Sequence, residues 1–183
     1  MEHLAKEDLS EILNRVNHWI ENCDAKASII LGGIGAFAGI LLATDNVSRF
    51  VSFLGRLWNN YSLLNVAYLL CILLSLVVLA VGIFLLIEVL FARVDPEEFK
   101  NRGVRGDSLI FFSSIAQNCT LSQYRGKLQN CSPEQMKEDF ISQIYICSLI
   151  CDKKFALYKK GFICSIIGLC SLILMMIIGL TMN

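Results

Sequence analysis

The sequence has 183 residues, of which 55% are hydrophobic and only 17% are charged, and its formal net charge at pH 7 is zero. A soluble domain of this length rarely carries so few charges, so the composition argues against a soluble protein and indicates a membrane protein. Three long uncharged stretches support this interpretation. Because backbone polar groups must find their partners inside the lipid, we expect these stretches to be transmembrane helices.

Residues 1–26 are predicted to form a cytoplasmic amphipathic helix that runs directly into the first span. Apolar side chains such as Leu9 and Val16 recur at helical spacing over residues 4–23. We expect this stripe to pack on the protein's own cytoplasmic helices, and a position flat on the membrane surface is the alternative. Six acidic residues precede the first apolar run, which argues against a signal peptide, so the run should remain in the mature protein.

Residues 27–44 form the first predicted transmembrane helix, with 18 uncharged residues that are just long enough to cross the hydrocarbon core. Gly32, Gly35 and Gly39 lie in this stretch, and Gly35 and Gly39 form a G-x-x-x-G pattern. Small residues let helix backbones approach closely in a membrane. The pattern therefore predicts a tight helix–helix contact, either within one subunit or around an oligomer axis, and it makes this helix a candidate to line a pore.

An external loop over residues 45–62 is expected to lead into the second transmembrane helix, residues 63–92. No charge interrupts the chain from Leu57 to Ile87, but Glu88 stands near the inner end of the span. An ionisable residue at the edge of a span is a functional candidate. The alternative is that Glu88 and Arg93 form an ordinary ion pair at the membrane interface.

Residues 93–160 are predicted to form a helical cytoplasmic segment, and residues 161–183 the third transmembrane helix. Asp107 or Ser108 is expected to cap a short helix. Ser132, with proline after it and glutamine at the third position, forms a capping-box start. No strong helix breaker follows before Gly161, so a long helix should continue toward the last span. The predicted fold class is thus an all-α membrane protein with three transmembrane helices.

The distribution of basic residues predicts the orientation. Residues 1–26 and 93–160 together hold 14 lysines and arginines, whereas residues 45–62 hold only two. The positive-inside rule therefore places the N-terminus and the 93–160 segment in the cytoplasm and the C-terminus on the opposite side of the membrane. The eight cysteines avoid the external connection, so we expect reduced thiols and no disulfide framework.

Several classes of chemistry are disfavoured. The chain has two histidines, His3 and His18, and neither lies in a predicted span, which argues against intramembrane serine proteases and metalloproteases. It has no Walker-type phosphate loop and no paired-histidine zinc motif. Cys147 and Cys151 share a helix face, but a role as core thiols is favoured. We therefore expect a protein that is not an enzyme and that uses no catalytic residue, cofactor or metal.

A basic cytoplasmic face with aromatic residues remains as a candidate site. Cations that hold phosphates and rings that stack on bases are typical of sites for nucleotides or single-stranded oligonucleotides. The alternative is ordinary positive-inside bias together with attraction to anionic lipids. The candidate ligand-binding residues are Arg93, Arg102, Arg105, Lys153, Lys154, Tyr145 and Tyr158.

Three motifs resemble the Pycsar-type transmembrane effector family. The stretch "HWIENCDAKASIILGGIGAFAGILL" resembles its opening segment, "SLIFFSSIAQ" resembles its cytoplasmic Phe-x-x-Ile-Ala segment, and "EDFISQIYICSLICDKKFALYKKGF" is similar to its closing helix. The order of helices, spans and loops covers nearly the whole chain. The matching positions are Trp19, Ile20, Asp24, Lys26, Ala27, Phe112, Ile115, Ala116, Gln143, Ile144, Tyr145, Lys154 and Phe155.

The resemblance implies an anti-phage effector that disrupts the inner membrane in abortive infection, under a nucleotide signal from a partner nucleotidyltransferase or cyclase. Similar effectors of Hailong-type systems form oligomeric ion channels that short DNA oligomers hold shut. We therefore expect a homo-oligomeric ion channel, with a tetramer as the best guess, gated or inhibited by a cyclic mononucleotide or a short single-stranded DNA. On infection this channel would depolarise the membrane.

The motif positions also suggest residues for assembly and gating. Asp24 and Lys26 are expected to join the cytoplasmic helices to the first span, through salt bridges to the long helix or to a neighbouring subunit, and Trp19 and Gln143 belong to the same motif set. Two other functions stay open: a membrane anchor or assembly protein that recruits a cytoplasmic partner, and a holin-like lytic protein.

Overall fold

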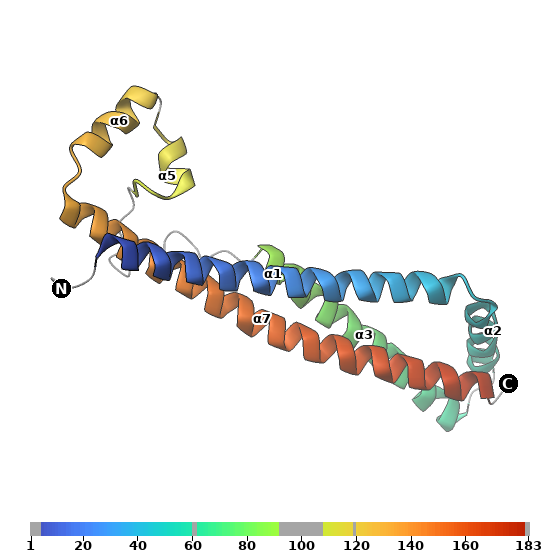
Figure 1. Ribbon diagram of the computed structural model, residues 1–183. Helices are drawn as coiled ribbons and strands as arrows, with labels where there is room; N and C mark the ends of the chain where they lie inside the picture. The colour runs from blue at the N-terminus through green and yellow to red at the C-terminus, as the bar shows by residue number, and fades with distance from the viewer. Residues whose placement is uncertain (1–4, 60–61, 92–107, 119, 182–183) are drawn as a thin grey trace. The chain divides into compact units, whose positions relative to one another are not determined.

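The computed structural model describes residues 5–59, 62–91, 108–118 and 120–181, and all regular elements within them are helices (Figure 1). Three of these helices are long and apolar enough to cross a membrane, which confirms the predicted fold class. The described helices are α1 (Lys6–Leu42), α2 (Asp45–Asn59), α3 (Leu63–Phe91), α5 (Phe112–Ala116), α6 (Leu121–Gln129) and α7 (Pro133–Thr181).

Helix α1 joins the amphipathic N-terminal stretch and the first apolar run in one uninterrupted helix of 37 residues, as the sequence predicts. Its buried residues Leu9, Val16 and Cys23 follow one another at intervals of seven. Two helical turns separate each pair, so all three lie on one face of α1. That face is the buried part of the apolar stripe read from the sequence, whereas Ile12 and Trp19 of the same stripe are exposed.

Helix α7 begins at the predicted capping box and runs for 49 residues. The backbone N–H of Ser132 donates to Oε1 of Gln135 at 3.0 Å, and the backbone N–H of Gln135 donates to Oγ of Ser132 at 3.1 Å. These two bonds satisfy donors that the first turn of a helix leaves unpaired. Pro133 occupies the first helical position, where its missing N–H costs nothing.

The chain folds as two compact units, and α1 and α7 each contribute to both. The first, here called the polar unit, comprises Met1–Cys23 and Ala92–Lys154. The second, here called the spanning unit, comprises Asp24–Phe91 and Phe155–Asn183. Helix α1 therefore passes from one unit to the other after Cys23, and α7 passes after Lys154.

Within the spanning unit, α3 and α7 pack in backbone contact through small residues. A Cβ placed on Gly82 of α3 would meet the backbone of Ser165 and lie 2.5 Å from its hydroxyl oxygen. A Cβ placed on Gly168 of α7 would lie 2.5 Å from the backbone nitrogen of Leu79. Small residues at such crossings are what allows membrane helices to approach this closely.

Two polar contacts reinforce the seam between α3 and α7. The hydroxyl oxygens of Ser75 and Ser171 lie 2.6 Å apart, and the Ser75 hydroxyl also donates to the carbonyl oxygen of Cys71 at 2.8 Å. The hydroxyl of Tyr68 donates to the carbonyl oxygen of Met175. In an apolar environment these groups need such partners, so the contacts also favour one register of the two helices.

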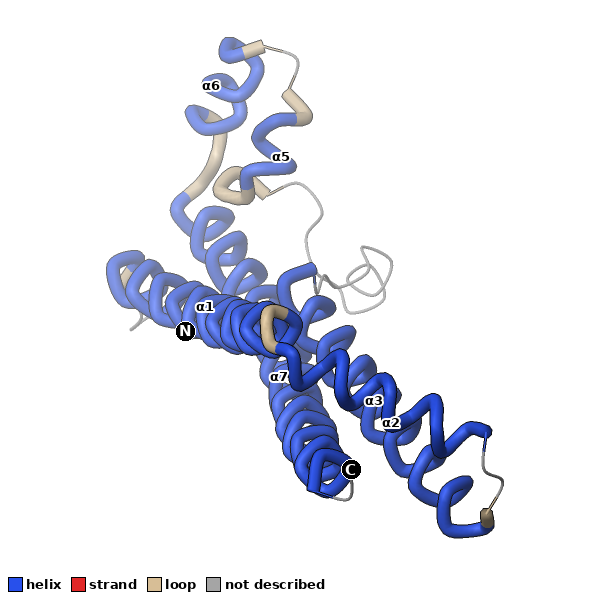
Figure 2. Tube along the Cα trace, turned by 90° about the vertical axis from the view of Figure 1, so that its right-hand side faces the viewer, coloured by secondary structure: helices blue, strands red, loops and turns tan. Residues whose placement is uncertain are grey.

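The connection between the first two spans, treated from the sequence as a loop over 45–62, contains helix α2. Phe50 and Phe53 on one face of α2 are buried against Tyr68 of α3 and against Met175 and Met176 of α7. Figures 1 and 2 show α2 turning away from the end of α1 and running alongside the start of α3. Apolar residues at helical spacing over residues 50–57 explain this helix.

Candidate functional site

A hydrogen-bonded node organises the polar unit around Leu109. The hydroxyl oxygen of Ser108 accepts from the backbone N–H of Phe111 at 3.0 Å and so closes the turn before α5, whereas the N-cap of the helix is Phe111 and not Ser108 as the sequence suggested. The backbone N–H of Leu109 donates to Oδ2 of Asp139 at 2.7 Å. The hydroxyl of Tyr124 in α6 donates to the Leu109 carbonyl oxygen at 2.8 Å. The node thereby ties the start of α5 to α6 and α7.

Asp139 is the most buried acid of this node, with only 2% of its surface exposed. Its Oδ2 accepts from Leu109, whereas its Oδ1 is buried and has no hydrogen-bond partner within the described structure. A carboxylate that accepts a backbone N–H orders the chain locally. The contacts of Asp139 therefore indicate a structural role for it in the polar unit.

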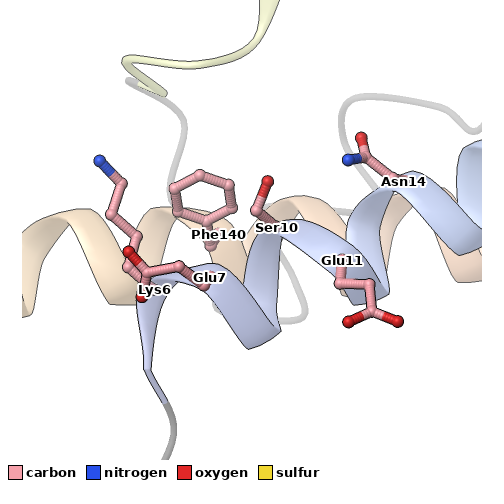
Figure 3. A pocket seen from close by; sticks show the side chains of 6 residues that line it. All are labelled: Lys6, Glu7, Ser10, Glu11, Asn14 and Phe140. Atoms are coloured by element: carbon pink, nitrogen blue, oxygen red, sulfur yellow. The ribbon is translucent and has the colours of Figure 1, made fainter.

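A groove of about 420 Å³ lies in the polar unit between α1 and α7 (Figure 3). The ring of Phe140 stands beside Ser10, while the carboxylate of Glu11 points away from the ring. Glu11 instead accepts from the Arg15 guanidinium at 2.8 Å. The remaining lining residues are Lys6, Glu7 and Asn14. Two carboxylates and one ammonium group give this groove no excess of positive charge, so it is a poor match for a phosphate.

None of the described members of the predicted ligand-binding set lines the groove beside Phe140. Lys153 and Tyr145 are exposed in the polar unit, whereas Lys154 is buried with 5% of its surface exposed. Tyr158 belongs to the spanning unit and stacks on Phe162, with ring centroids 6.0 Å apart. Arg93, Arg102 and Arg105 lie outside the described residues.

The two thiols of α7 in the polar unit have the character of packed side chains. Burial and the neighbouring Cys151 raise the pKa of Cys147. Burial and Asp152 raise the pKa of Cys151, although Lys154 acts in the opposite direction. A raised thiol pKa keeps the sulfur protonated at neutral pH, and the protonated thiol is neither a nucleophile nor a metal ligand. The raised pKa values of both thiols therefore agree with the prediction that Cys147 and Cys151 are packed core residues.

Three residues of the predicted assembly and gating motif, Trp19, Asp24 and Lys26, lie on α1 within five residues of the point where this helix passes from the polar unit to the spanning unit. Asp24 is the first residue of α1 in the spanning unit; it is half-buried, whereas Lys26 is exposed. Trp19 lies just before this point, with half of its surface exposed. On α7, Gln143 is buried with 5% exposed, and Lys154 is the last residue of the polar unit.

The glycines of α1 differ from those of α3 and α7. A Cβ placed on Gly32, Gly35 or Gly39 would meet no atom of the described residues within 4 Å. Glu88, the other packing candidate, is exposed on α3. Within the described part of the chain these glycines make no tight contact, and the predicted contact around an oligomer axis stays a prediction.

Sequence reasoning did not single out the Asp139 node or the glycine seam between α3 and α7. The seam carried a signal, since Gly161, Ser165 and Gly168 repeat small residues at helical spacing. The node carried none, because an aspartate in a polar helix gives no indication that it will be buried. Within the described residues, no group of three or more His, Cys, Asp or Glu residues is arranged to hold a metal ion.

Comparison with known proteins places this arrangement in a family. The family model of the Pycsar effector protein domain matches residues 8–181, which includes every described helix except the first residues of α1. The chain belongs to the Pycsar effector family. The Pycsar effector protein GmPycTM of Gulbenkiania mobilis is 32% identical over 168 residues, covering 85% of this chain and 83% of that protein. No solved structure matches the chain significantly.

Membership confirms the resemblance read from the three motifs. As a Pycsar effector with three apolar helices, the protein is a membrane effector of anti-phage defence. The family match extends across both units, so the polar unit and the spanning unit are parts of one effector domain.

Proposed function

We propose that this Pycsar effector is a homo-oligomeric ion channel of the bacterial inner membrane, without enzymatic activity, whose opening is controlled by a nucleotide ligand. One observation carries the proposal: a Cβ placed on any member of the glycine stripe of α1, defined here as Gly32, Gly35 and Gly39, would meet none of the described residues within 4 Å. The remaining support comes from the closed seam between α3 and α7, the charge distribution and the family.

The glycine stripe lies on the side of α1 opposite to the side that faces α7. An apolar groove of about 280 Å³ in the spanning unit is lined by Ile30, Ile34 and Phe37 of α1 and by residues of α7. On a helix with 3.6 residues per turn, the glycine stripe falls about half a turn away from these three residues. Since small stripes in membranes favour helix contacts, a second copy of the chain is the proposed occupant.

The burial of the spanning helices agrees with an incomplete bundle. Only 6% of the most apolar window of α1 is buried inside the chain, against 22% for α3 and 17% for α7. Gly82 and Gly168 bring α3 and α7 into backbone contact and leave no room for ions between them. A conduction path is therefore proposed between subunits, with α1 near the axis. A tetramer is our preferred assembly. Helix α3, with Glu88 at its inner end, is the other candidate to line the conduction path.

The basic residues support a cytoplasmic position for the N-terminus and the polar unit, and a periplasmic position for the C-terminus. This orientation exposes the polar unit to nucleotides made in the cell. Because relatives are named as Pycsar effectors, we propose a cyclase or nucleotidyltransferase as the partner that makes the signal. The proposed ligands are a cyclic mononucleotide and a short single-stranded DNA.

Lys153 is the best test of the proposed ligand site, because it is exposed in the polar unit. Replacing it in Lys153→Gln should weaken nucleotide binding about tenfold, the effect of losing one charge-assisted hydrogen bond. Wild-type affinity should also fall as salt is raised. Calorimetric titration in detergent measures both effects. Lys127→Gln, at an exposed lysine of α6 outside the set, is the matched control. Equal affinities for the two variants, or an affinity insensitive to salt, would refute this site.

Asp24 and Lys26 are proposed to couple the polar unit to the channel, since α1 passes between the units at these residues. In Asp24→Ala/Lys26→Ala the ion pairs proposed for this segment are lost, so the double variant should assemble poorly or gate poorly. The checks are oligomer mass in detergent and ion flux in liposomes. An oligomer of normal mass with normal ligand-dependent flux would show that the two residues have no such role.

A further inference from the structure

Helix α2 connects two of the helices that are long and apolar enough to cross a membrane, α1 and α3. It begins three residues after α1 ends at Leu42, and Thr44 forms the turn, its hydroxyl donating to the Leu41 carbonyl oxygen at 2.8 Å. Helix α3 then begins at Leu63, four residues after α2 ends. Connections this short keep α2 close to the end of α1 and to the start of α3, two helices that can cross the bilayer. Its distance from the hydrocarbon core is thereby limited.

The packing of α2 also fixes its rotation about its own axis. The ring of Phe53 lies edge-on to the ring of Tyr68, with centroids 5.8 Å apart. A Cβ placed on Gly179 of α7 would lie 2.9 Å from Phe50 and 3.0 Å from Phe53, so α7 approaches this face closely. Because Phe50 and Phe53 are held against α3 and α7, the rotation of α2 about its own axis is fixed. The sides of the helix on which its other residues lie are therefore fixed as well.

The two exposed edges of α2 carry opposite chemistry. Val51 and Trp58, seven residues apart, are 59% and 65% exposed and lie about 90° to one side of Phe50 on the helix. Arg49 and Arg56, also seven apart and exposed, lie about 110° to the other side. A large apolar edge and a cationic edge that flank one anchored face are typical of helices that lie in the plane of a membrane interface.

We propose that α2 is an interfacial helix that binds the surface of the bilayer that α1 reaches at Leu42, and that its occupant is anionic phospholipid. The Trp58 ring suits the boundary between acyl chains and headgroups, where tryptophan is enriched. The guanidinium groups of Arg49 and Arg56 complement the phosphates of the same lipids. This inference concerns a lipid site and holds whether or not the oligomer conducts ions.

Tryptophan fluorescence tests the position of α2. The full-length Trp19→Phe variant retains Trp58 alone, and it is reconstituted in vesicles of phosphatidylcholine and phosphatidylglycerol. We expect lipids brominated near the glycerol backbone to quench most of the Trp58 emission, and aqueous iodide to quench little. The matched control places the only tryptophan on the polar face of the same helix, as Ser52→Trp in a Trp19→Phe/Trp58→Phe background. This control should respond to iodide and not to bromine.

The arginine edge is tested with the same single-tryptophan protein. Bromine carried by phosphatidylglycerol should quench Trp58 more strongly than bromine carried by phosphatidylcholine, with a local enrichment of roughly fivefold for one arginine near an anionic surface. Arg49→Gln/Arg56→Gln should abolish this preference. Quenching of Trp58 by iodide alone would place α2 in water, and quenching by neither agent would place it under protein; both results overturn the proposal. An equal effect of the two lipids before substitution would overturn the phosphate contacts.

Discussion

Replacing Gly82 by leucine is expected to lower the midpoint of thermal unfolding in detergent by roughly 10 °C. The new side chain would have to occupy the position held by the backbone and hydroxyl of Ser165, so α3 and α7 must move apart. Overpacking of this kind costs up to about 3 kcal/mol, and for a protein of this size each kcal/mol moves the midpoint by roughly 2–4 °C. The contact between the hydroxyl groups of Ser75 and Ser171 should be lost when α3 and α7 move apart.

The matched control for this experiment is Gly55→Leu. Gly55 is an exposed glycine of α2, and a Cβ placed there would meet nothing within 4 Å. The same change of residue type should therefore leave the midpoint close to that of the wild type. If both variants unfold at the wild-type temperature, α3 and α7 do not make the close contact described above.

Replacing Gly35 by leucine is expected to leave the subunit folded and to dissociate the oligomer. Because none of the described residues lies within 4 Å of the added Cβ, the subunit has room for the side chain. At a tight interface between copies, the same side chain should cost about 1–3 kcal/mol per contact, which corresponds to a rise of roughly 5-fold to 150-fold in each dissociation constant. Analytical ultracentrifugation in detergent measures the assembly, and ion flux in liposomes should fall with it.

Ala38→Leu provides the control for the glycine stripe. Ala38 is exposed on the same helix, but it lies off the stripe. Its variant should assemble and conduct like the wild type. A Gly35→Leu protein of unchanged mass and unchanged flux would exclude the glycine stripe from the subunit interface, whatever the oligomer proves to be.

Much of the helical framework was predictable because its signals are local. The capping box at Ser132 needs only residues within one helical turn, and the structure has both of its hydrogen bonds. The continuity of α1 and α7 follows from the absence of helix breakers over long stretches. The three spans follow from the length of their apolar runs, since composition alone identifies such helices.

The packing was less predictable, because it depends on which small residues meet. The chain has small residues at helical spacing in both the first and the third span, and the sequence did not indicate which set meets a partner inside the subunit. The structure gives that role to Gly168 of α7 with Gly82 of α3, and it leaves Gly35 open. The helical nature of residues 45–59 could have been read from the spacing of Phe50, Phe53 and Leu57, but the charge count alone drew attention to this region.

The candidate site was the least predictable part. A ligand site built from several segments depends on tertiary contacts that one sequence does not specify. Positive charge in residues 93–160 has two sources, phosphate binding and membrane orientation, and counting lysines cannot separate them. Lys154 illustrates the limit, since it was predicted to bind a ligand and its burial, with 5% of its surface exposed, had no signal in the sequence.

Ion flux through the purified protein in liposomes, with and without cyclic mononucleotides and short DNA oligomers, is the most direct test of the central claim. A nucleotide-controlled channel predicts a flux that one of these ligands switches on or off, and the direction of the change reveals whether the ligand opens or closes the protein. Absence of flux under every condition, from protein shown to be folded and oligomeric, would contradict the channel and favour a membrane anchor that recruits a partner.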